Sequence, residues 1–361
     1  MGVARRFVVA VLGGLVALVL SGAASAQEPT VTTAPPTNST IPRSDARMTV
    51  TTDITYYPGG PDLDAYIPTR GTGPRPALVM VHGGGWAAGD QSELAPWARQ
   101  AAVEQGWAAF TVDYRLDPTD PVAWADELHD VQAAIRFIAT NASRWDVDTD
   151  RIMLLGDSAG GNLVALVSSV GTVDPVRGRA VGTAPELSVP IVAVGLWSPP
   201  TDLAQLVPEH GAPPAACAGA PTCDFAWDTP AVTKYIGCPL ADCPDTYAQA
   251  SPLTWVDRRT APSYVANGTR ELIPLGQVRA YVRELDANGV TNTFDVLDTT
   301  LHAVQLGDQV WPPTERFLNE QLQAVGPAAA AGGPPWLLLG AAAVVVVALV
   351  AVGVGFVRRR R

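Results

Sequence analysis

A serine flanked by glycines follows a short apolar run near the middle of the chain. The segment Gly156–Gly161 contains the pattern Gly-x-Ser-x-Gly, with Ser158 at its centre, and it comes directly after the apolar residues 152–155. An apolar segment that suits a helix begins at once after it. A sharp strand-to-helix turn of this kind lifts a serine hydroxyl above the end of a sheet, and the glycines let neighbouring backbone approach closely. The pattern therefore predicts a strained turn between a strand and a helix, with an exposed nucleophile.

A second motif, His82-Gly83-Gly84-Gly85-Trp86, also follows a strand-like run, residues 77–81. When a serine attacks an acyl carbonyl, negative charge develops on the carbonyl oxygen, and preorganised backbone N–H groups stabilise it. Glycines allow such donors to approach the oxygen. We expect the N–H groups of Gly84 and Gly85 to act with that of Ala159, the residue after the serine. His82 is expected to hold the loop by hydrogen bonds.

With these motifs, the chain resembles an α/β-hydrolase of the hormone-sensitive-lipase-like or feruloyl-esterase-like carboxylesterase group. The residues that carry the resemblance are 82–86, 112–116, 148–152 and 156–161. It covers about residues 49 to 324. The resemblance implies a mostly parallel central sheet with helices on both faces, and ester hydrolysis without a metal or organic cofactor.

A serine hydroxyl needs a histidine to take its proton, and in this fold the histidine follows the serine in the chain. The chain has four histidines. His82 and His129 precede Ser158, and His210 comes before any loop that would carry the acid. His302, after the last predicted strand, is therefore expected to be the base.

The acid that orients this histidine is expected on the loop after residues 262–267. The family usually has an aspartate there, but this loop contains only one carboxylate, Glu271, and Arg270 stands where the aspartate is expected. We therefore predict Glu271 as the acid, with Asp295 and Asp298 as alternatives. Asp157 and Asp113 are expected to support the site through hydrogen bonds.

Both ends of the chain have the character of sorting segments. Residues 1–26 combine two arginines, an apolar run and a final Ala-Ser-Ala, which is typical of a secretory signal. Residues 336–357 carry no charge and precede four arginines, residues 358–361, as expected for a transmembrane helix with a basic cytoplasmic tail. A Thr/Pro-rich leader (27–47) and an Ala/Gly/Pro tether (325–335) flank the predicted hydrolase domain, residues 48–324. The sequence thus predicts a catalytic domain outside the cell, anchored by its C-terminal helix.

The charge of the remaining chain excludes one class of partner. Without the six arginines of the two ends, the chain has 18 basic and 35 acidic residues, which gives a net charge of −17. Such a surface repels nucleic acid and anionic membranes. The expected partner is a small-molecule or lipid ester, and the oligomeric state stays open.

Short apolar runs alternate with segments that suit helices, which predicts a mostly parallel sheet. Strands are expected at 48–56, 63–68, 77–82, 108–114, 151–156, 191–197, 262–267 and 293–297, the first two forming an antiparallel edge. Helices are expected at 93–105, 122–141, 159–169, 275–288 and 312–324; the second is preceded by the cap residues Asp120 and Pro121.

Residues 199–250 break this alternation and contain all four cysteines. In an oxidising compartment an even, clustered set predicts two disulfides, and we favour the local pairs Cys217–Cys223 and Cys238–Cys243. A zinc site is the alternative. We interpret the segment as a disulfide-stapled lid or pocket wall. The alternative is a surface segment that does not contact the substrate.

These residues together predict a serine carboxylesterase. An amidase, formamidase or peptidase on the same scaffold is the nearest alternative, because the same groups cleave amides. A cell-surface binding protein that has kept a hydrolase shape is a further alternative, favoured only by the unusual acid loop.

Overall fold

In the part of the chain that the structure describes, eight strands form one mixed sheet. The computed structural model describes residues 45–71, 73–116, 124–173, 186–207 and 231–326. The strands are β1 (Met48–Thr55), β2 (Asp62–Pro68), β3 (Arg75–Val81), β4 (Ala108–Val112), β5 (Val147–Asp157), β6 (Ile191–Trp197), β7 (Ser263–Gly268) and β8 (Asn292–Leu297). Their order across the sheet is β1-β2-β4-β3-β5-β6-β7-β8. The pairs β1–β2 and β2–β4 are antiparallel, and all others are parallel. The predicted antiparallel edge and parallel centre are confirmed.

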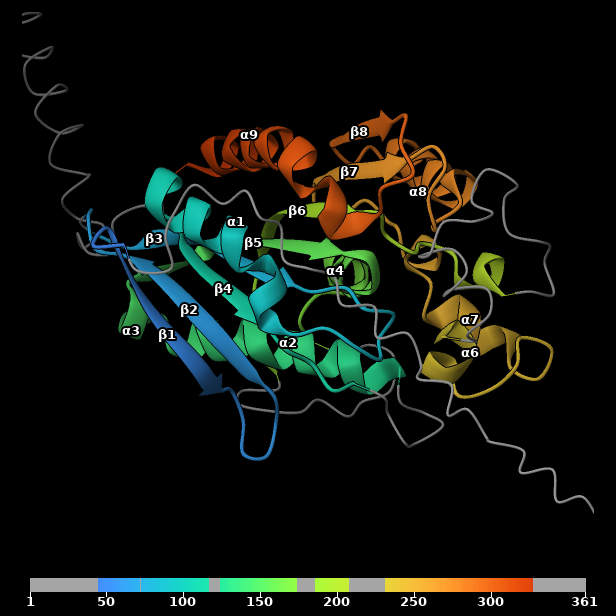
Figure 1. The fold of residues 1–361 in the computed structure, drawn as a ribbon, viewed down its shortest axis with the longest axis horizontal. Coiled ribbons are helices and arrows are strands. Elements are labelled where there is room, and N and C mark those ends of the chain that lie inside the picture. Colours follow the sequence, from blue (N-terminus) through green and yellow to red (C-terminus); the bar gives the residue numbers. More distant parts are fainter. Residues whose placement is uncertain (1–44, 72, 117–123, 174–185, 208–230, 327–361) are drawn as a thin grey trace, which may run out of the picture. The chain divides into compact units, whose positions relative to one another are not determined.

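The helices lie on both sides of the sheet (Figure 1). They are α1 (Ala95–Gln100), α2 (Trp124–Thr140), α3 (Ala142–Trp145), α4 (Ser158–Val170), α6 (Ala231–Ile236), α7 (Pro244–Gln249), α8 (Leu275–Ala287) and α9 (Gly307–Val325). Short 3₁₀ segments are η1 (Gln91–Leu94), η3 (Leu203–Leu206), η5 (Pro252–Thr254) and η6 (Ala303–Leu306), and η2 (Ala101–Gln105) is a π-helical turn.

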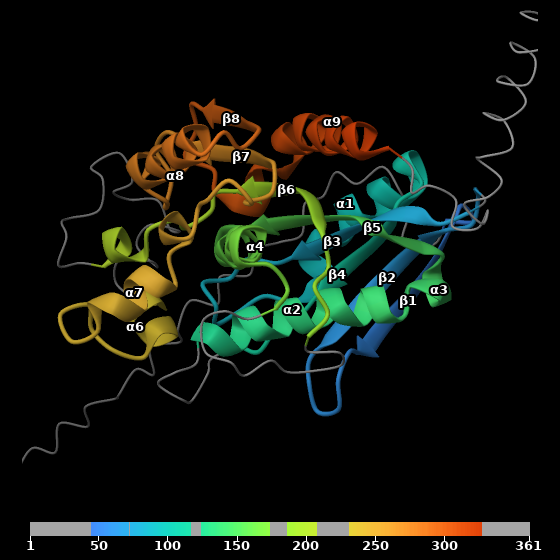
Figure 2. The same cartoon turned by 180° about the vertical axis from the view of Figure 1, so that it is seen from behind.

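Two cores form because successive side chains of a strand point to opposite faces. In β3, Ala77 and Val79 join the core with α2, α4 and α8, whereas Leu78 and Met80 join the core with α1 and α9. Figures 1 and 2 show α1 and α9 together on one side of the sheet and α2 on the other. Burial on both faces explains why the central strands have nearly continuous apolar sequences.

Two predicted helices differ from the structure in their bounds. The helix expected at 93–105 is divided into η1, α1 and the π turn η2. The helix expected to start at Pro312 begins five residues earlier, at Gly307, and contains both Pro312 and Pro313. A proline leaves the carbonyl four residues before it without a helical partner. Here those carbonyls belong to Asp308 and Gln309, which are exposed, so that water can satisfy them.

Several predictions concern segments outside the described residues. These are the signal segment 1–26, the leader 27–47 apart from its last three residues, the helix cap at Asp120 and Pro121, His210, the pair Cys217–Cys223, the tether 325–335 beyond its first two residues, the membrane segment 336–357 and the basic tail 358–361. Within the ranges that the structure covers, no helix combines the length and apolar character needed to cross a membrane.

The predicted insertion lies between β6 and β7. Its described part consists of η3, α6 and α7, and a disulfide joins Cys238 to Cys243 across the turn between α6 and α7. This pairing is the one predicted for these two cysteines. Figure 1 shows α6 and α7 beyond the end of the sheet toward which the arrows of β5 and β7 point. In open α/β sheets ligands bind at that end.

Candidate active site

Ser158 occupies a strained turn at the carboxyl end of β5. Its φ angle is 49°, in the left-handed region that non-glycine residues rarely adopt, and α4 begins at this residue. The flanking glycines permit the turn: a Cβ on Gly156 would lie 2.3 Å from the carbonyl oxygen of Gly160, and one on Gly160 would lie 2.1 Å from that of Val81. The glycines two before and two after the serine are thus required by close backbone contacts.

His302 reaches the serine from the loop after β8. Its Nε2 lies 2.8 Å from Oγ of Ser158. Hydrogen bonds fix the backbone on both sides of the imidazole: the N–H of His302 donates to Oε1 of Gln305 at 3.1 Å, and the N–H of Ala303 donates to Oγ of Ser198 at 2.9 Å. The imidazole is therefore held in contact with the serine hydroxyl.

The other ring nitrogen of His302 contacts Glu271. Nδ1 of His302 forms a hydrogen bond with Oε2 of Glu271, which is buried on the loop after β7. The carboxylate also accepts the N–H of Gly268 at 3.1 Å. A carboxylate on Nδ1 favours the tautomer that carries its proton there, which leaves Nε2 free to accept the proton of Ser158. Serine, histidine and glutamate thus form one continuous chain of contacts.

The alternative acids bond elsewhere. Asp295 accepts the hydroxyl of Tyr264 at 2.7 Å, and Asp298 is exposed, where it accepts the hydroxyl of Thr269 at 3.0 Å. Arg270 turns outward and lies 3.3 Å from Asp298. Of the three candidate carboxylates, only Glu271 contacts His302 within the described part of the chain.

The glycine loop, residues His82–Trp86, lies beside the serine turn. A Cβ on Gly83 would lie 3.1 Å from Cβ of Ser158, and one on Gly84 would lie 2.0 Å from the carbonyl oxygen of Ala88. Gly84, Gly85 and Trp86 all have positive φ angles, of 110°, 61° and 60°. Ala159 is the first residue after the serine in α4, where helix geometry leaves N–H groups without intrahelical partners. The glycine loop thus lies against the turn that carries Ser158 and Ala159, and the part of Gly84, Gly85 and Ala159 as oxyanion donors stays a prediction.

His82 anchors the start of the glycine loop. Its ring stacks on Tyr114 with centroids 4.5 Å apart, and Nδ1 lies 2.7 Å from the carbonyl oxygen of Gly83. Nε2 faces Asp113 at 3.5 Å. Burial acts to lower the pKa of His82, but the contacts with Asp113 and the Gly83 carbonyl outweigh it, so the pKa is raised. The ring is buried and directed away from solvent, in agreement with a structural part in the loop.

Asp157 lies directly beneath the glycine loop. The carboxyl accepts the N–H of Gly83, and a Cβ on that glycine would lie 2.8 Å from Oδ2. Burial raises the pKa of Asp157 to about 7, and the nearby Glu93 carboxylate acts in the same direction. Asp157 thus connects the serine turn to the glycine loop through a group that titrates near neutral pH.

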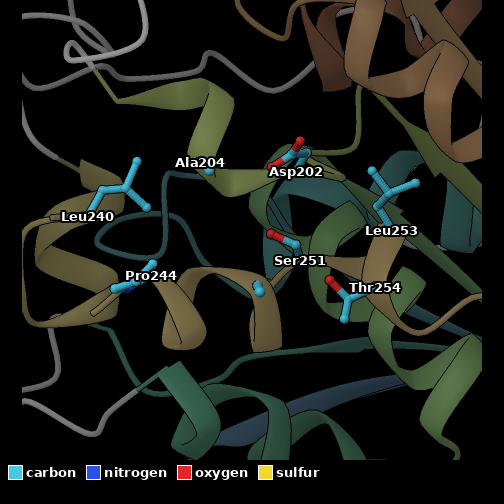
Figure 3. Close-up of a pocket in the computed structure, with 8 residues that line it drawn as sticks. Asp202, Ala204, Leu240, Pro244, Ser251, Leu253 and Thr254 are labelled. Carbon is cyan, nitrogen blue, oxygen red and sulfur yellow. The ribbon is translucent and has the colours of Figure 1, made fainter. Parts of the chain in front are cut away.

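The insertion contacts the glycine loop through aromatic rings. Tyr235 of α6 stacks on Trp86 with centroids 4.3 Å apart and an angle of 8° between the planes. A separate cavity of about 350 Å³ lies between η3, α7 and η5 (Figure 3). Its lining includes none of Ser158, His302 and Glu271; the residues are Asp202, Ala204, Leu240, Pro244, Ala248, Ser251, Leu253 and Thr254.

Three supporting residues were not predicted from the sequence. Tyr114 lies within residues 112–116, which carry part of the family resemblance, but its contact with His82 joins the segments that follow β4 and β3. Ser198 and Asn162 carry no local signal, because each acts on backbone far away in the chain: Asn162 donates to the carbonyls of Pro200 and Ala250, at 2.9 and 3.1 Å.

The geometry of other polar clusters does not suggest a metal site. Within the described ranges, no group of three or more His, Cys, Asp or Glu side chains is arranged to hold a metal ion. Cys238 and Cys243 bond to each other and so do not supply two thiolates to the zinc site considered as an alternative. His129, in the middle of α2, lies 3.8 Å from Asp126.

Comparison with known proteins agrees with this geometry. Residues 63–285 match the family described as BD-FAE. The chain is 29% identical over 252 residues to Esterase LipC of Mycobacterium tuberculosis (strain ATCC 25618 / H37Rv), a match that covers 65% of this chain and 58% of that protein. It is 27% identical over 269 residues to Esterase LipQ of the same organism, covering 72% of this chain and 58% of that protein. The match thus spans less than three fifths of the length of these two relatives.

Solved structures show the same fold. A truncated form of a carbohydrate esterase from gut microbiota superimposes with a TM-score of 0.65 at 22% identity, covering 78% of this chain and 98% of that one. This similarity supports the predicted α/β-hydrolase fold. The resemblance stated from the sequence motifs is confirmed by the family match.

Proposed function

The chain belongs to the BD-FAE family, and from this premise we propose that it is a serine carboxylesterase that hydrolyses carboxylic esters through an acyl-enzyme intermediate. The observation that carries the proposal is the chain of contacts from Ser158 through His302 to Glu271 at the end of the sheet. The names of the relatives LipC and LipQ, both esterases, support the same class of reaction.

In the proposed first step, Oγ of Ser158 attacks the acyl carbon while its proton passes to Nε2 of His302. Glu271 stabilises the imidazolium that forms. The carbonyl oxygen becomes negatively charged and is held by the N–H groups of Gly84, Gly85 and Ala159. Collapse of this intermediate breaks the bond to the alcohol oxygen, which takes the proton from His302, and leaves the acyl group on Ser158.

In the second step, water attacks the acyl-enzyme. His302 takes a proton from the water, and a second tetrahedral intermediate forms in the same set of N–H donors. Its collapse returns the proton to Oγ of Ser158 and releases the carboxylic acid. The two half-reactions use the same residues, so no further group is required for the overall hydrolysis.

We further propose that the catalytic domain acts on the outer face of the cell membrane. The apolar and basic character of residues 1–26 and 336–361 supports this location, as does the disulfide between Cys238 and Cys243, since disulfides persist in oxidising compartments. The substrate would then be an ester present outside the cell.

The experiment that tests the proposed function is Ser158→Ala in a purified protein. We expect turnover of p-nitrophenyl esters to fall to the background rate and labelling by a fluorophosphonate probe to disappear, with the circular dichroism spectrum unchanged. Alanine is small enough for the turn but removes the nucleophile. A folded Ser158→Ala protein that still hydrolyses esters would refute the mechanism.

Substrate class is tested with matched compounds. A panel of p-nitrophenyl esters of increasing acyl length defines the preferred chain, and an ester and an anilide of the same acid are compared directly. We expect the ester to be the better substrate. A higher kcat/KM for the anilide would favour the amidase alternative.

A further inference from the structure

We propose that Tyr235 of the insertion is a positioning residue for the glycine loop, acting through Trp86. This inference rests on the proposed function for its kinetic consequence, because the glycine loop is where we place the oxyanion donors Gly84 and Gly85. The structural part of the proposal concerns only how the loop is held.

The glycine loop is strained and needs support from its surroundings. Three consecutive residues, Gly84, Gly85 and Trp86, have positive φ angles, and for the tryptophan this conformation is unfavourable. Such backbone persists only where neighbouring contacts determine it. The conformation of Trp86 is therefore not one that this residue adopts by local preference alone.

At its start the loop is fixed by the sheet. Tyr114, just after β4, stacks on His82, and its hydroxyl donates to the carbonyl oxygen of His82 at 3.0 Å. Both rings are buried. The first residue of the loop is thus held by a hydrogen bond and by a ring contact.

At its end the loop is held by backbone hydrogen bonds, from the N–H groups of Ala87 and Ala88 to the carbonyl oxygen of Gly84 at 3.2 and 3.1 Å, and by packing of the Trp86 side chain. The indole of Trp86 is 3% exposed, and its Nε1 has no hydrogen-bond partner among the described residues. Its ring lies parallel to that of Tyr235 at 4.3 Å. Among the described residues, Tyr235 is the ring that stacks on this indole, and we assign to this face-to-face contact the part of fixing the orientation of the indole.

Tyr235 is itself well fixed. Its ring is 2% exposed, and its hydroxyl donates to the carbonyl oxygen of Trp124, the first residue of α2, at 3.3 Å. The turn after α6 is closed by the disulfide Cys238–Cys243, and the hydroxyl of Tyr247 in α7 donates to the carbonyl of Cys238 at 3.1 Å. The insertion thus presents a rigid ring to Trp86.

The insertion is also tied to the serine helix. Asn162, one turn after Ser158 in α4, donates to Pro200 and Ala250, which stand near the two ends of the insertion. The same segment therefore contacts the element that carries the nucleophile and the loop that carries the donors. The insertion therefore helps to set the position of the glycine loop relative to the serine helix α4.

The consequence is an effect on turnover more than on substrate affinity. Donors to an oxyanion act in the transition state, and loss of one such donor costs roughly 10²–10³ in kcat. A loop that is loosened, with its donors still present, should lose less. We expect Tyr235→Ala to lower kcat by about 10- to 100-fold with KM changed by less than about threefold.

The experiment compares Tyr235→Ala with Tyr235→Phe and with Tyr66→Ala as a matched control. Phenylalanine keeps the ring that stacks on Trp86, so it should keep kcat within about twofold of the unchanged protein. Tyr66→Ala removes an equally buried tyrosine from β2, and this tyrosine belongs to the core on the opposite face of the sheet from Trp86 and Tyr235. Unfolding temperatures of all variants are measured alongside.

Amide hydrogen exchange of peptides covering residues 82–89 measures how firmly the loop backbone is held, without any catalytic assay. We expect exchange at least about tenfold faster in Tyr235→Ala and unchanged in Tyr235→Phe and Tyr66→Ala, with core peptides of β3 and β5 unchanged in Tyr235→Ala. If the unchanged protein hydrolyses no ester, the proposed esterase fails, and this exchange result still decides the positioning role.

Two kinetic readouts distinguish positioning from general damage. A trifluoromethyl ketone forms a tetrahedral oxyanion on the serine, so its inhibition constant should weaken in Tyr235→Ala by the same factor as kcat. In a Trp86→Ala background, Tyr235→Ala should have little further effect. The proposal is overturned if loop exchange is unchanged in Tyr235→Ala, if Tyr66→Ala has the same effect on the loop, or if Tyr235→Ala and Trp86→Ala act independently.

Discussion

At the scale of the residue, Glu271 gives the sharpest prediction about the reaction. Glu271→Gln keeps the shape of the side chain but removes the charge that would stabilise the His302 imidazolium. Loss of the equivalent charge in a serine protease lowers kcat by about four orders of magnitude, and we expect a loss of roughly two to four orders here. The measurement is kcat for a p-nitrophenyl ester in protein whose unfolding temperature is unchanged.

The controls for this prediction are Asp295→Asn and Asp298→Asn. Asp295 bonds to Tyr264 and Asp298 lies on the surface beside Arg270, so each change should alter kcat by less than about threefold. Near-normal activity in Glu271→Gln together with an inactive Asp298→Asn would show that the acid has been assigned to the wrong loop.

Asp157 gives a prediction about stability and pH. An acid whose pKa is higher in the folded than in the unfolded protein stays protonated up to a higher pH in the folded state. The stability that this neutral form provides is lost as the pH rises through the folded-state pKa. For Asp157, whose pKa rises from 3.8 to about 7, this loss is at most about 4 kcal/mol between pH 4 and 8. Asp157→Asn removes the titration.

The test is the free energy of unfolding of both proteins at pH 5 and at pH 8. We expect the asparagine variant to gain stability relative to the unchanged protein at the higher pH. A difference between the two proteins that does not depend on pH would mean that Asp157 is already ionised in the folded protein throughout this range.

Residues of the site differ in how far the sequence reveals them. Ser158 and His302 follow from a local motif and from the order of residues along the chain, and Glu271 from being the only carboxylate on its loop. Tyr235 could not be assigned, because its partner Trp86 lies about 150 residues away in the chain.

At the scale of the element, strands were easier to predict than helix ends. Strands buried on both faces appear as apolar runs bounded by glycine, proline or charge, so β3 and β6 were located to within two residues. Helix ends depend on the contacts that tertiary structure provides. The start of α9 is an example, since Trp311 and Val310 extend the helix toward the core despite the prolines that follow.

The turn between α6 and α7 gives a prediction about stability. The double variant Cys238→Ser/Cys243→Ser opens a loop that joins residues five positions apart, which in the chain-entropy model costs about 2 kcal/mol. We expect a lower unfolding temperature and faster proteolysis of the insertion. An unchanged unfolding temperature and cleavage rate would show that the contacts of Tyr247 suffice without the disulfide.

The second predicted disulfide, Cys217–Cys223, is tested by counting thiols. Denatured protein that has not been reduced should bind no thiol reagent, and reduction should release four reactive thiols. Two reactive thiols before reduction would show that only the pair Cys238–Cys243 is formed.

At the scale of the whole molecule, the terminal segments give a prediction about location. A bilayer is spanned by about 20 apolar residues, and residues 336–357 meet this requirement in composition. A chain that ends at residue 335 should therefore be released into the medium, whereas the full chain should sediment with membranes and resist extraction by high salt. The measurement is esterase activity and immunodetection in each fraction.

The outcome that contradicts this prediction is equally direct. If the full chain and the shortened chain are found in the same fraction, the C-terminal segment does not anchor the protein. Retention of both chains inside the cell would instead show that residues 1–26 do not direct export.

The contacts of Asn162 have a consequence for recombination between relatives. Its amide donates to the carbonyls of Pro200 and Ala250, so the two ends of the insertion are held by their main-chain oxygens. These hydrogen bonds do not depend on which side chains the insertion carries. We therefore expect that the corresponding segment of a relative, even one of different length, can replace residues 201–249 if it leaves Pro200 and Ala250 in their present positions. Chimeras joined at these two carbonyls should fold, whereas junctions that displace either carbonyl leave the buried amide unsatisfied beside the nucleophile.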